Sequence, residues 1–162
     1  MNNILKYSLF IWVFLALALP QTISAQKKKD KKAAITQAVQ AQNYIFKAQT
    51  ALPQAGSTRQ LTTDFDLRIS KDTIVSDLPY FGRAYTAPMN PSQGPLRFTS
   101  TDFDYSITDR KKGGWDVVIT PKDTQDPRQL TLTIFDNGSA SVVVTSYNRQ
   151  PISFNGYVIA KR

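Results

Sequence analysis

Residues at intervals of three and four form a stripe along residues 33–51. The stripe contains Ile35, Ala38, Val39, Gln42, Ile45, Phe46 and Gln49. This spacing is that of one face of an α-helix, so we expect a single amphipathic helix over 33–51. Pro53 and Gly56 follow the stripe and end the helical pattern.

From Gln60 onward the pattern changes to alternation, which is typical of β-strands. Leu61, Phe65, Leu67 and Ile69 fall on one side of the first predicted strand, and Asp64, Asp66, Arg68 and Ser70 on the other. Further alternating segments follow to the C-terminus. We therefore predict a mainly β fold of the α+β type, in which the N-terminal helix precedes about seven to eight antiparallel strands. The strands would form a sandwich or a half-open barrel, with the helix covering an open face or end.

The register of one hairpin follows from the rule that apolar faces must match across it. In TIFDNGSASVVV, a two-residue turn at Asn137-Gly138 would place Ile134 opposite Ser141 and Leu132 opposite Val143, which mixes the two faces. A three-residue loop over residues 136–138 instead places Ile134 opposite Ala140 and Leu132 opposite Val142. Gly138 then occupies the left-handed position that glycine adopts most easily. The sequence therefore predicts the three-residue loop.

The segment FDYSITDRKKGGWDVVI fits the same turn design. A loop over residues 111–113, ending in glycine, sets Ile107 opposite Val117. A looser hairpin is expected to join residues 63–70 to residues 73–78 around Lys71-Asp72. The last strand, residues 152–159, carries Asn155-Gly156 in its middle, which predicts a β-bulge.

Residues 1–25 have the three parts of a secretory signal. Lys6 lies near the start, residues 7–19 are an apolar run, and the small-residue sequence TISA ends the segment. We expect cleavage before Gln26; the alternative, retention as a membrane anchor, is disfavoured because the run is shorter than the ~20 residues that span a bilayer. There is no cysteine, which excludes disulfides and lipid attachment at a cysteine. The sequence thus predicts a periplasmic or secreted monomer that is not a lipoprotein.

Much of the formal net charge of +8 comes from KKKDKK at residues 27–32. We interpret residues 26–32 as a basic flexible tail and residues 33–162 as a single β-rich domain. The tail is either a solvated spacer or a segment attracted to an anionic envelope surface. Nucleic acid is not an expected partner, because export removes the chain from it.

Five strings occur in order along the chain: LPYFGRAY, KKGGWDV, PKD, FDNGSA and NRQPISFNGY. Together they closely resemble an uncharacterised family of small exported proteins from Bacteroidetes-type bacteria, domain of unknown function 4251. The resemblance runs from about residue 43 to residue 159. It implies an exported or periplasmic setting and no activity. Many members carry a lipoprotein cysteine, which this chain lacks, so envelope anchoring is not implied here.

The chain has no histidine, cysteine or glutamate, and its 12 acidic residues are all aspartate. This composition excludes thiol catalysis, the usual zinc sites and nucleophiles that depend on an imidazole base. Asp64 with Asp66, and Asp102 with Asp104, each share a strand face about 7 Å apart, a separation compatible with two-carboxylate glycoside hydrolysis. Both pairs lie on the polar face, so solvated surface positions are the simpler interpretation. We expect no cofactor and no metal, and an Asp-based hydrolase is the least favoured function.

Two connections offer better binding chemistry. Residues 79–95 form a long connection with four prolines, and residues 148–151 read NRQP between two predicted strands. Prolines and aromatic side chains lower the entropic cost of presenting a fixed surface, and arginine binds carboxylates through its planar donor fork. If the two connections meet, an anionic or sugar-like ligand would be bound by Tyr80, Phe81, Arg83, Tyr85, Asn148, Arg149 and Gln150.

A structural interpretation competes with this binding hypothesis. Tyr80 and Phe81 would seal a small β fold, the arginines would satisfy carbonyls or pair with aspartate, and Trp115 would be a core residue. Two functions therefore stay open beside the disfavoured enzyme: a ligand- or peptide-binding module, and a structural or assembly component of the cell envelope without a small-molecule ligand.

Overall fold

The computed structural model describes residues 21–85 and 96–161. Most of the predicted signal segment lies outside the described residues. The described part contains one helix and nine strands: α2 (Gln21–Gln40), β1 (Tyr44–Pro53), β2 (Arg59–Ile69), β3 (Ile74–Leu78), β4 (Leu96–Ser100), β5 (Phe103–Asp109), β6 (Trp115–Pro121), β7 (Gln129–Ile134), β8 (Ser139–Thr145) and β9 (Ile152–Ala160). None of its helices is long and apolar enough to span a membrane.

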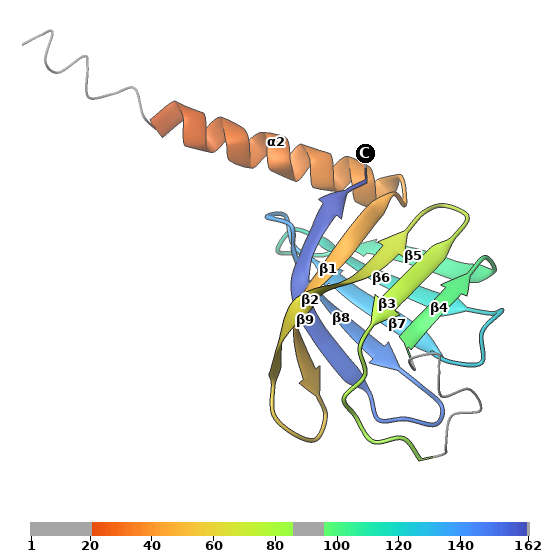
Figure 1. The fold of residues 1–162 in the computed structure, drawn as a ribbon. Coiled ribbons are helices and arrows are strands. Elements are labelled where there is room, and N and C mark those ends of the chain that lie inside the picture. The colour runs from red at the N-terminus through yellow and green to blue at the C-terminus, as the bar shows by residue number, and fades with distance from the viewer. Residues whose placement is uncertain (1–20, 86–95, 162) are drawn as a thin grey trace, which may run out of the picture.

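The nine strands form a single antiparallel sheet in the order β4-β3-β2-β1-β9-β8-β7-β6-β5. The sheet curls into a nearly closed barrel, and α2 extends from one end of it (Figure 1). The predicted mainly β class is therefore confirmed, with nine strands in place of seven or eight. The sequence left open a sandwich or a half-open barrel, and the structure shows a barrel.

The two terminal strands of the sheet, β4 and β5, are consecutive in the chain and separated only by Thr101 and Asp102. Asp123, in the β6–β7 connection, holds this link. Its carboxylate accepts hydrogen bonds from the backbone N–H groups of Thr101 at 2.7 Å and Asp102 at 3.2 Å, and from the Ser100 hydroxyl at 2.5 Å. These bonds stabilise the charged form and lower the pKa of Asp123 to about 2.

The predicted helix over 33–51 is wrong in its extent. The helix ends at Gln40, and residues 44–53 form β1. Tyr44, Phe46 and Ala48 are buried at alternate positions along β1, which lies between β2 and β9. Pairing on both edges decides the structure of this segment, and a period of two fits its apolar positions as well as the helical stripe does. Residues 26–32, predicted to be a flexible tail, lie inside α2.

The end of α2 has the hydrogen bonds of a Schellman motif. The Asn43 N–H donates to the Ala38 carbonyl oxygen at 2.8 Å, and the Gln42 N–H donates to the Val39 carbonyl oxygen at 3.2 Å. Gln42 has a φ of 52°, in the left-handed region that the motif requires. The turn directs the chain from the helix into β1.

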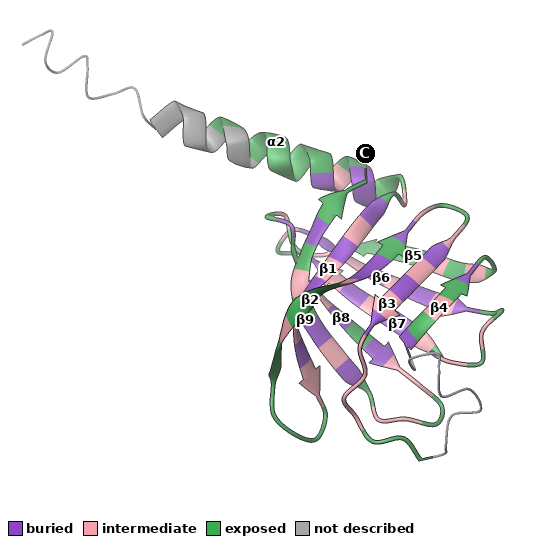
Figure 2. Cartoon of the chain, in the orientation of Figure 1, coloured by how far each residue is buried: buried purple, intermediate pink, exposed green. Residues whose placement is uncertain are grey.

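The last turns of α2 cover one end of the barrel. Ile35, Ala38 and Val39 are buried there, whereas most of the preceding described residues of the helix are exposed (Figure 2). Lys32 pairs with Asp136 of the β7–β8 turn at 2.6 Å. The expectation that the helix covers an end of the sheet is confirmed.

Burial alternates along β3, β6 and β7, so these strands present one face to the interior and one to the outside (Figure 2). Tyr44, Phe46 and Phe154 are among the largest fully buried side chains. Trp115 is 6% exposed, which confirms its prediction as a core residue. The barrel interior is filled by side chains.

The predicted hairpin registers are confirmed. Ile134 lies opposite Ala140, and Ile107 lies opposite Val117. The residues flanking the three-residue loops are hydrogen-bonded to each other, and Gly113 and Gly138 have φ values of 86° and 83°. The hairpin around residues 71–72 is also present, because the Ser70 N–H donates to the Thr73 carbonyl oxygen.

The irregularity predicted at Asn155-Gly156 exists, but the extra residue is on the neighbouring strand. Ala48 pairs with Gly156 and Thr50 with Asn155, which leaves Gln49 of β1 without a partner residue. The bulge therefore belongs to β1, opposite the two residues that indicated it.

Of the four aspartates predicted to be solvated, three are exposed: Asp64, Asp102 and Asp104. Asp66 is instead 4% exposed. Lys47, directly opposite on β1, lies 3.0 Å from its Oδ2, and Arg68 lies 3.1 Å from its Oδ1. The two long cationic side chains cover this carboxylate on the outer face of the sheet, so the prediction was wrong for Asp66.

Candidate functional site

The two connections singled out in the sequence meet at the end of the barrel away from α2. The Tyr85 N–H donates to the Asn148 carbonyl oxygen at 2.8 Å, and the Gln150 N–H donates to the Arg83 carbonyl oxygen at 3.1 Å. Ala84 and Arg149 form an antiparallel bridge between these bonds. Residues 83–85 and 148–150 therefore lie side by side. The rest of the first connection, residues 86–95, lies outside the described residues.

Tyr80 and Phe81 are half-buried and pack against the core. The Tyr80 hydroxyl lies 2.9 Å from the carbonyl oxygens of both Arg83 and Gln150, so it ties the two connections together. Burial raises the pKa of Tyr80, an effect that the nearby Arg149 guanidinium partly offsets. The Phe81 ring stacks with the Arg59 guanidinium at 4.8 Å. These contacts agree with the sealing role that the sequence left open for both aromatics.

The contacts of the Arg149 side chain indicate a structural role. Its Nε lies 3.4 Å from Oδ2 of Asp126, its guanidinium lies 5.7 Å from the centre of the Tyr80 ring, and its side chain is 13% exposed. Gln150 is also half-buried, and its backbone pairs with Arg83. Arg149 and Gln150 therefore support the junction from beneath.

Arg83 differs from Arg149 because it is exposed. Among the residues that the structure describes, no side chain or carbonyl binds its guanidinium. Tyr85 is 69% exposed beside it, and Tyr147 on the neighbouring connection is 68% exposed. Arg128 stacks on Tyr147 at 5.5 Å. We call the surface formed by Arg83, Tyr85, Arg128, Tyr147 and Asn148 the rim.

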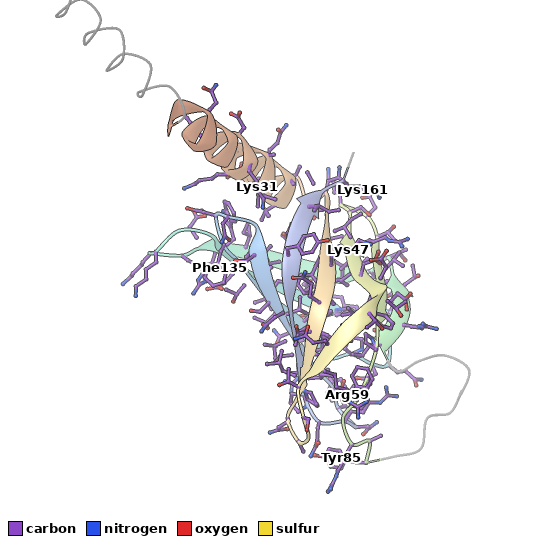
Figure 3. The ribbon with its side chains drawn as sticks, turned by 60° about the vertical axis from the view of Figure 1, so that its left-hand side comes forward. Lys31, Lys47, Arg59, Tyr85, Phe135 and Lys161 are labelled. Carbon is purple, nitrogen blue, oxygen red and sulfur yellow. The ribbon has the colours of Figure 1, made fainter. Side chains whose placement is uncertain are left out.

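Figure 3 shows where the rim lies. Tyr85 and Arg59 are at the end of the barrel away from the helix, whereas Lys31 and Lys161 are at the helix end. Tyrosine and arginine are the residue types most enriched at the energetically important centres of protein interfaces. A guanidinium without a partner can bind a carboxylate through two parallel hydrogen bonds. The chemistry available at the rim is therefore recognition of an anionic group beside aromatic surface.

Asp126, Arg128 and Tyr147 were not among the residues predicted from the sequence. A signal for them existed in the order of the strands. In an up-and-down sheet, alternate connections lie at the same end, so the β6–β7 connection shares an end with the β8–β9 connection that carries Arg149. The Asp126–Arg149 pair is the direct result.

In each of the two aspartate pairs noted in the sequence, one carboxylate is bound by a cationic side chain. Asp64 and Asp66 share the outer face, but Asp66 is covered by Lys47 and Arg68. Asp104 is exposed and pairs with Lys122 at 2.6 Å, which raises the pKa of Lys122. Within residues 21–85 and 96–161, no group of three or more acidic side chains is placed to hold a metal ion.

Comparison with known proteins identifies the family of the chain. The family model described as "Domain of unknown function (DUF4251)" matches residues 26–158. The chain belongs to this family. The resemblance seen in the sequence is thereby confirmed, and no curated protein matches the chain.

A crystal structure of a DUF4251 family protein from Bacteroides eggerthii is similar to this DUF4251 chain, with a TM-score of 0.62. The two sequences are 16% identical, and the alignment covers 80% of this chain and 87% of that chain. At this level of identity the likeness shows the fold alone.

Proposed function

We propose that this DUF4251 protein is exported and acts as a binding module whose rim recognises a carboxylate-bearing peptide. The observation that carries the proposal is the pairing of residues 83–85 with residues 148–150. This pairing places the exposed Arg83 and Tyr85 next to Asn148 and Tyr147 on a fixed backbone. A surface held in one conformation loses little entropy on binding.

The filled interior also supports a surface site. Tyr44, Phe46 and Phe154 are fully buried inside the barrel, so their side chains occupy interior space that holds a ligand in some other barrels. Binding is then expected on the outside of the barrel. The rim combines an arginine that has no partner among the described residues with exposed aromatic rings.

Carboxylate is the anion best matched to these side chains in an extracytoplasmic peptide. The planar fork of Arg83 binds a carboxylate through two nitrogens, and Asn148 adds a neutral donor and acceptor beside it. Tyr85 and Tyr147 supply rigid apolar area with a hydroxyl at the outer end. An acidic segment of a peptide meets both requirements.

The test is a titration followed by NMR of the isotope-labelled protein. The probe is a four-residue glutamate peptide with blocked ends, and the control is the matching glutamine peptide. We expect the glutamate peptide to shift the amide signals of Tyr85 and Asn148, and to bind at least about tenfold more tightly than the glutamine peptide, a difference of about 1.4 kcal/mol. Equal binding of the two peptides, or shifts confined to other parts of the barrel, would overturn the proposal.

A further inference from the structure

The ladder between β1 and β2 is interrupted in the middle of the sheet. Ala48 pairs with Phe65, and the next pair is Thr50 with Gln60. One residue on β1, Gln49, therefore lies opposite four residues on β2, residues 61–64. An excursion of this size bends a strand and changes the direction of its side chains.

The neighbouring strand β9 is fitted closely to this interruption. Gly156 pairs with Ala48, and a Cβ at Gly156 would overlap the carbonyl oxygen of Lys47. Only glycine allows the two backbones to approach this far. The interruption of the β1–β2 ladder is therefore accompanied by a close approach of β9 to β1.

The excursion forms a half-open cavity of about 270 Å³ on the outer face of the sheet. Among its lining residues are Lys47, Gln60, Thr62, Thr63, Asp64 and Tyr157. Tyr157 is directly opposite Lys47 on β9 and is 39% exposed. Figure 3 shows Lys47 on the side of the barrel, between the helix end and the end that carries Tyr85. The cavity is therefore separate from the rim.

Two of the polar side chains that line the cavity, Lys47 and Gln60, are held by partners of their own. Lys47 Nζ is fixed 3.0 Å from Oδ2 of Asp66. The Thr50 hydroxyl donates to Oε1 of Gln60 at 3.0 Å, so the NH₂ group of Gln60 is the part of that amide without a partner among the described residues. A fixed donor binds a ligand at low entropic cost.

The residues at the cavity offer both hydrogen-bond donors and hydrogen-bond acceptors, and their charges balance. Gln60 offers donors, Asp64 offers acceptors, and the hydroxyls of Thr62 and Thr63 do both. Lys47 and Arg68 both pair with Asp66, so the charges of these three residues and of Asp64, which lines the cavity, sum to zero. A charged ligand would leave one of these groups poorly matched. Neutral hydroxyl groups, which donate and accept at once, match the lining.

We propose that this cavity binds a neutral carbohydrate ring. Its hydroxyls would exchange hydrogen bonds with Gln60, Asp64 and the threonines, and one apolar face of the ring would pack on Tyr157. The inference goes beyond the rim, because it concerns a different surface and an uncharged ligand. It stands or falls independently of peptide binding.

The test uses glucose, galactose and N-acetylglucosamine as probes, each titrated into the isotope-labelled protein. We expect at least one of them to shift the amide signals of Lys47, Thr62 and Tyr157 with a millimolar Kd, which corresponds to about −4 kcal/mol. No shift with any of the three up to roughly 50 mM, far above that Kd, would overturn the proposal. Shifts restricted to the rim amides would overturn it as well.

Three variants make the test specific. Tyr157→Ala should weaken sugar binding at least about tenfold, because the ring loses its packing surface. Phe135, beside the β7–β8 turn, is 43% exposed and so is comparable to Tyr157. Phe135→Ala should leave the sugar Kd unchanged. Tyr157→Phe keeps the ring and should bind more tightly than Tyr157→Ala. Equal sugar affinity in the wild type and Tyr157→Ala would contradict the proposed site, whereas the glutamate peptide should bind Tyr157→Ala normally.

Discussion

Oδ2 of Asp126 lies 3.4 Å from Nε of Arg149, and both side chains are largely buried, at 19% and 13% exposure. The pair joins the β6–β7 connection to the β8–β9 connection beneath the rim. The carbonyl oxygen of Arg83 accepts a hydrogen bond from the N–H of Gln150, the residue that follows Arg149. The Arg83 side chain is exposed and has no partner among the described residues. Two arginines that look alike in the sequence therefore have different roles, and their substitution should have different effects.

Arg149→Ala should destabilise the protein by about 3 kcal/mol, because it leaves the Asp126 carboxylate buried without a counter-ion. The measurement is chemical denaturation. The double variant Arg149→Leu with Asp126→Leu should recover part of the loss, since it removes both charges. A loss below about 0.5 kcal/mol for Arg149→Ala, as at an ordinary surface position, would contradict a structural role.

Arg83→Ala should change the free energy of unfolding by no more than about 0.5 kcal/mol, because an exposed side chain without partners among the described residues adds little to stability. Thermal melting of the variant beside the wild type measures this. A large drop in Tm would show that Arg83 supports the junction and would remove it from the binding surface.

Stability should fall at acid pH through Asp123. Its pKa in the folded protein is about 2, below the ordinary value of 3.8, because Ser100 and the backbone N–H groups of Thr101 and Asp102 bind the charged carboxylate. A lowered pKa contributes stability that is fully present above pH 4 and is lost as the pH falls toward 2. Tm measured between pH 7 and pH 2 should therefore decline, most steeply below pH 4.

Asp123→Asn provides the comparison for this effect. The variant should have a lower Tm at pH 7 and a shallower decline at acid pH, because the group that titrates is gone. Asp72→Asn, an exposed substitution in the turn between β2 and β3, should keep the wild-type profile. If Tm fell in parallel with pH in the wild type and in Asp123→Asn, the hydrogen bonds of Asp123 to the β4–β5 link would not contribute to the acid dependence of stability.

Gln42→Gly should stabilise the protein by about 0.5–1 kcal/mol. Gln42 has a φ of 52° at the end of α2, a conformation that is unfavourable for a residue with a Cβ and free of penalty for glycine. Gln37→Gly, in the exposed face of the helix, should instead destabilise by about 0.5–1 kcal/mol. Urea denaturation compares the two, and a loss of stability in Gln42→Gly would contradict the helix end described here.

Hairpin geometry could be predicted from the sequence because two local signals agreed. Matching of apolar faces fixed Ile134 opposite Ala140, and Gly138 supplied the left-handed residue that the three-residue loop needs. The boundary between helix and strand at residues 40–44 could not be predicted in this way. Tyr44 and Phe46 fit both periods, and only the pairing of β1 with β2 and β9 decides between them.

The candidate site was predictable in part. The sequence suggested that the two proline-containing connections, which carry Arg83 and Arg149, lie side by side. Backbone hydrogen bonds between residues 83–85 and 148–150 join them in the structure. The sequence did not separate the roles of the two arginines. That difference comes from Asp126, which reaches Arg149 only because the barrel brings the β6–β7 connection to the same end. The burial of Asp66 likewise depends on a cross-strand lysine, Lys47.

The central claim is that the rim binds an acidic peptide through Arg83, and the most direct test is one titration of the glutamate peptide against two variants. Arg83→Ala should weaken binding at least about fivefold, or about 1 kcal/mol, while Lys112→Ala, which removes the same charge from the exposed β5–β6 turn at the other end, should bind as the wild type does. An equal loss in both variants would mean that net charge alone attracts the peptide. That result, or unchanged binding by Arg83→Ala, would contradict the claim.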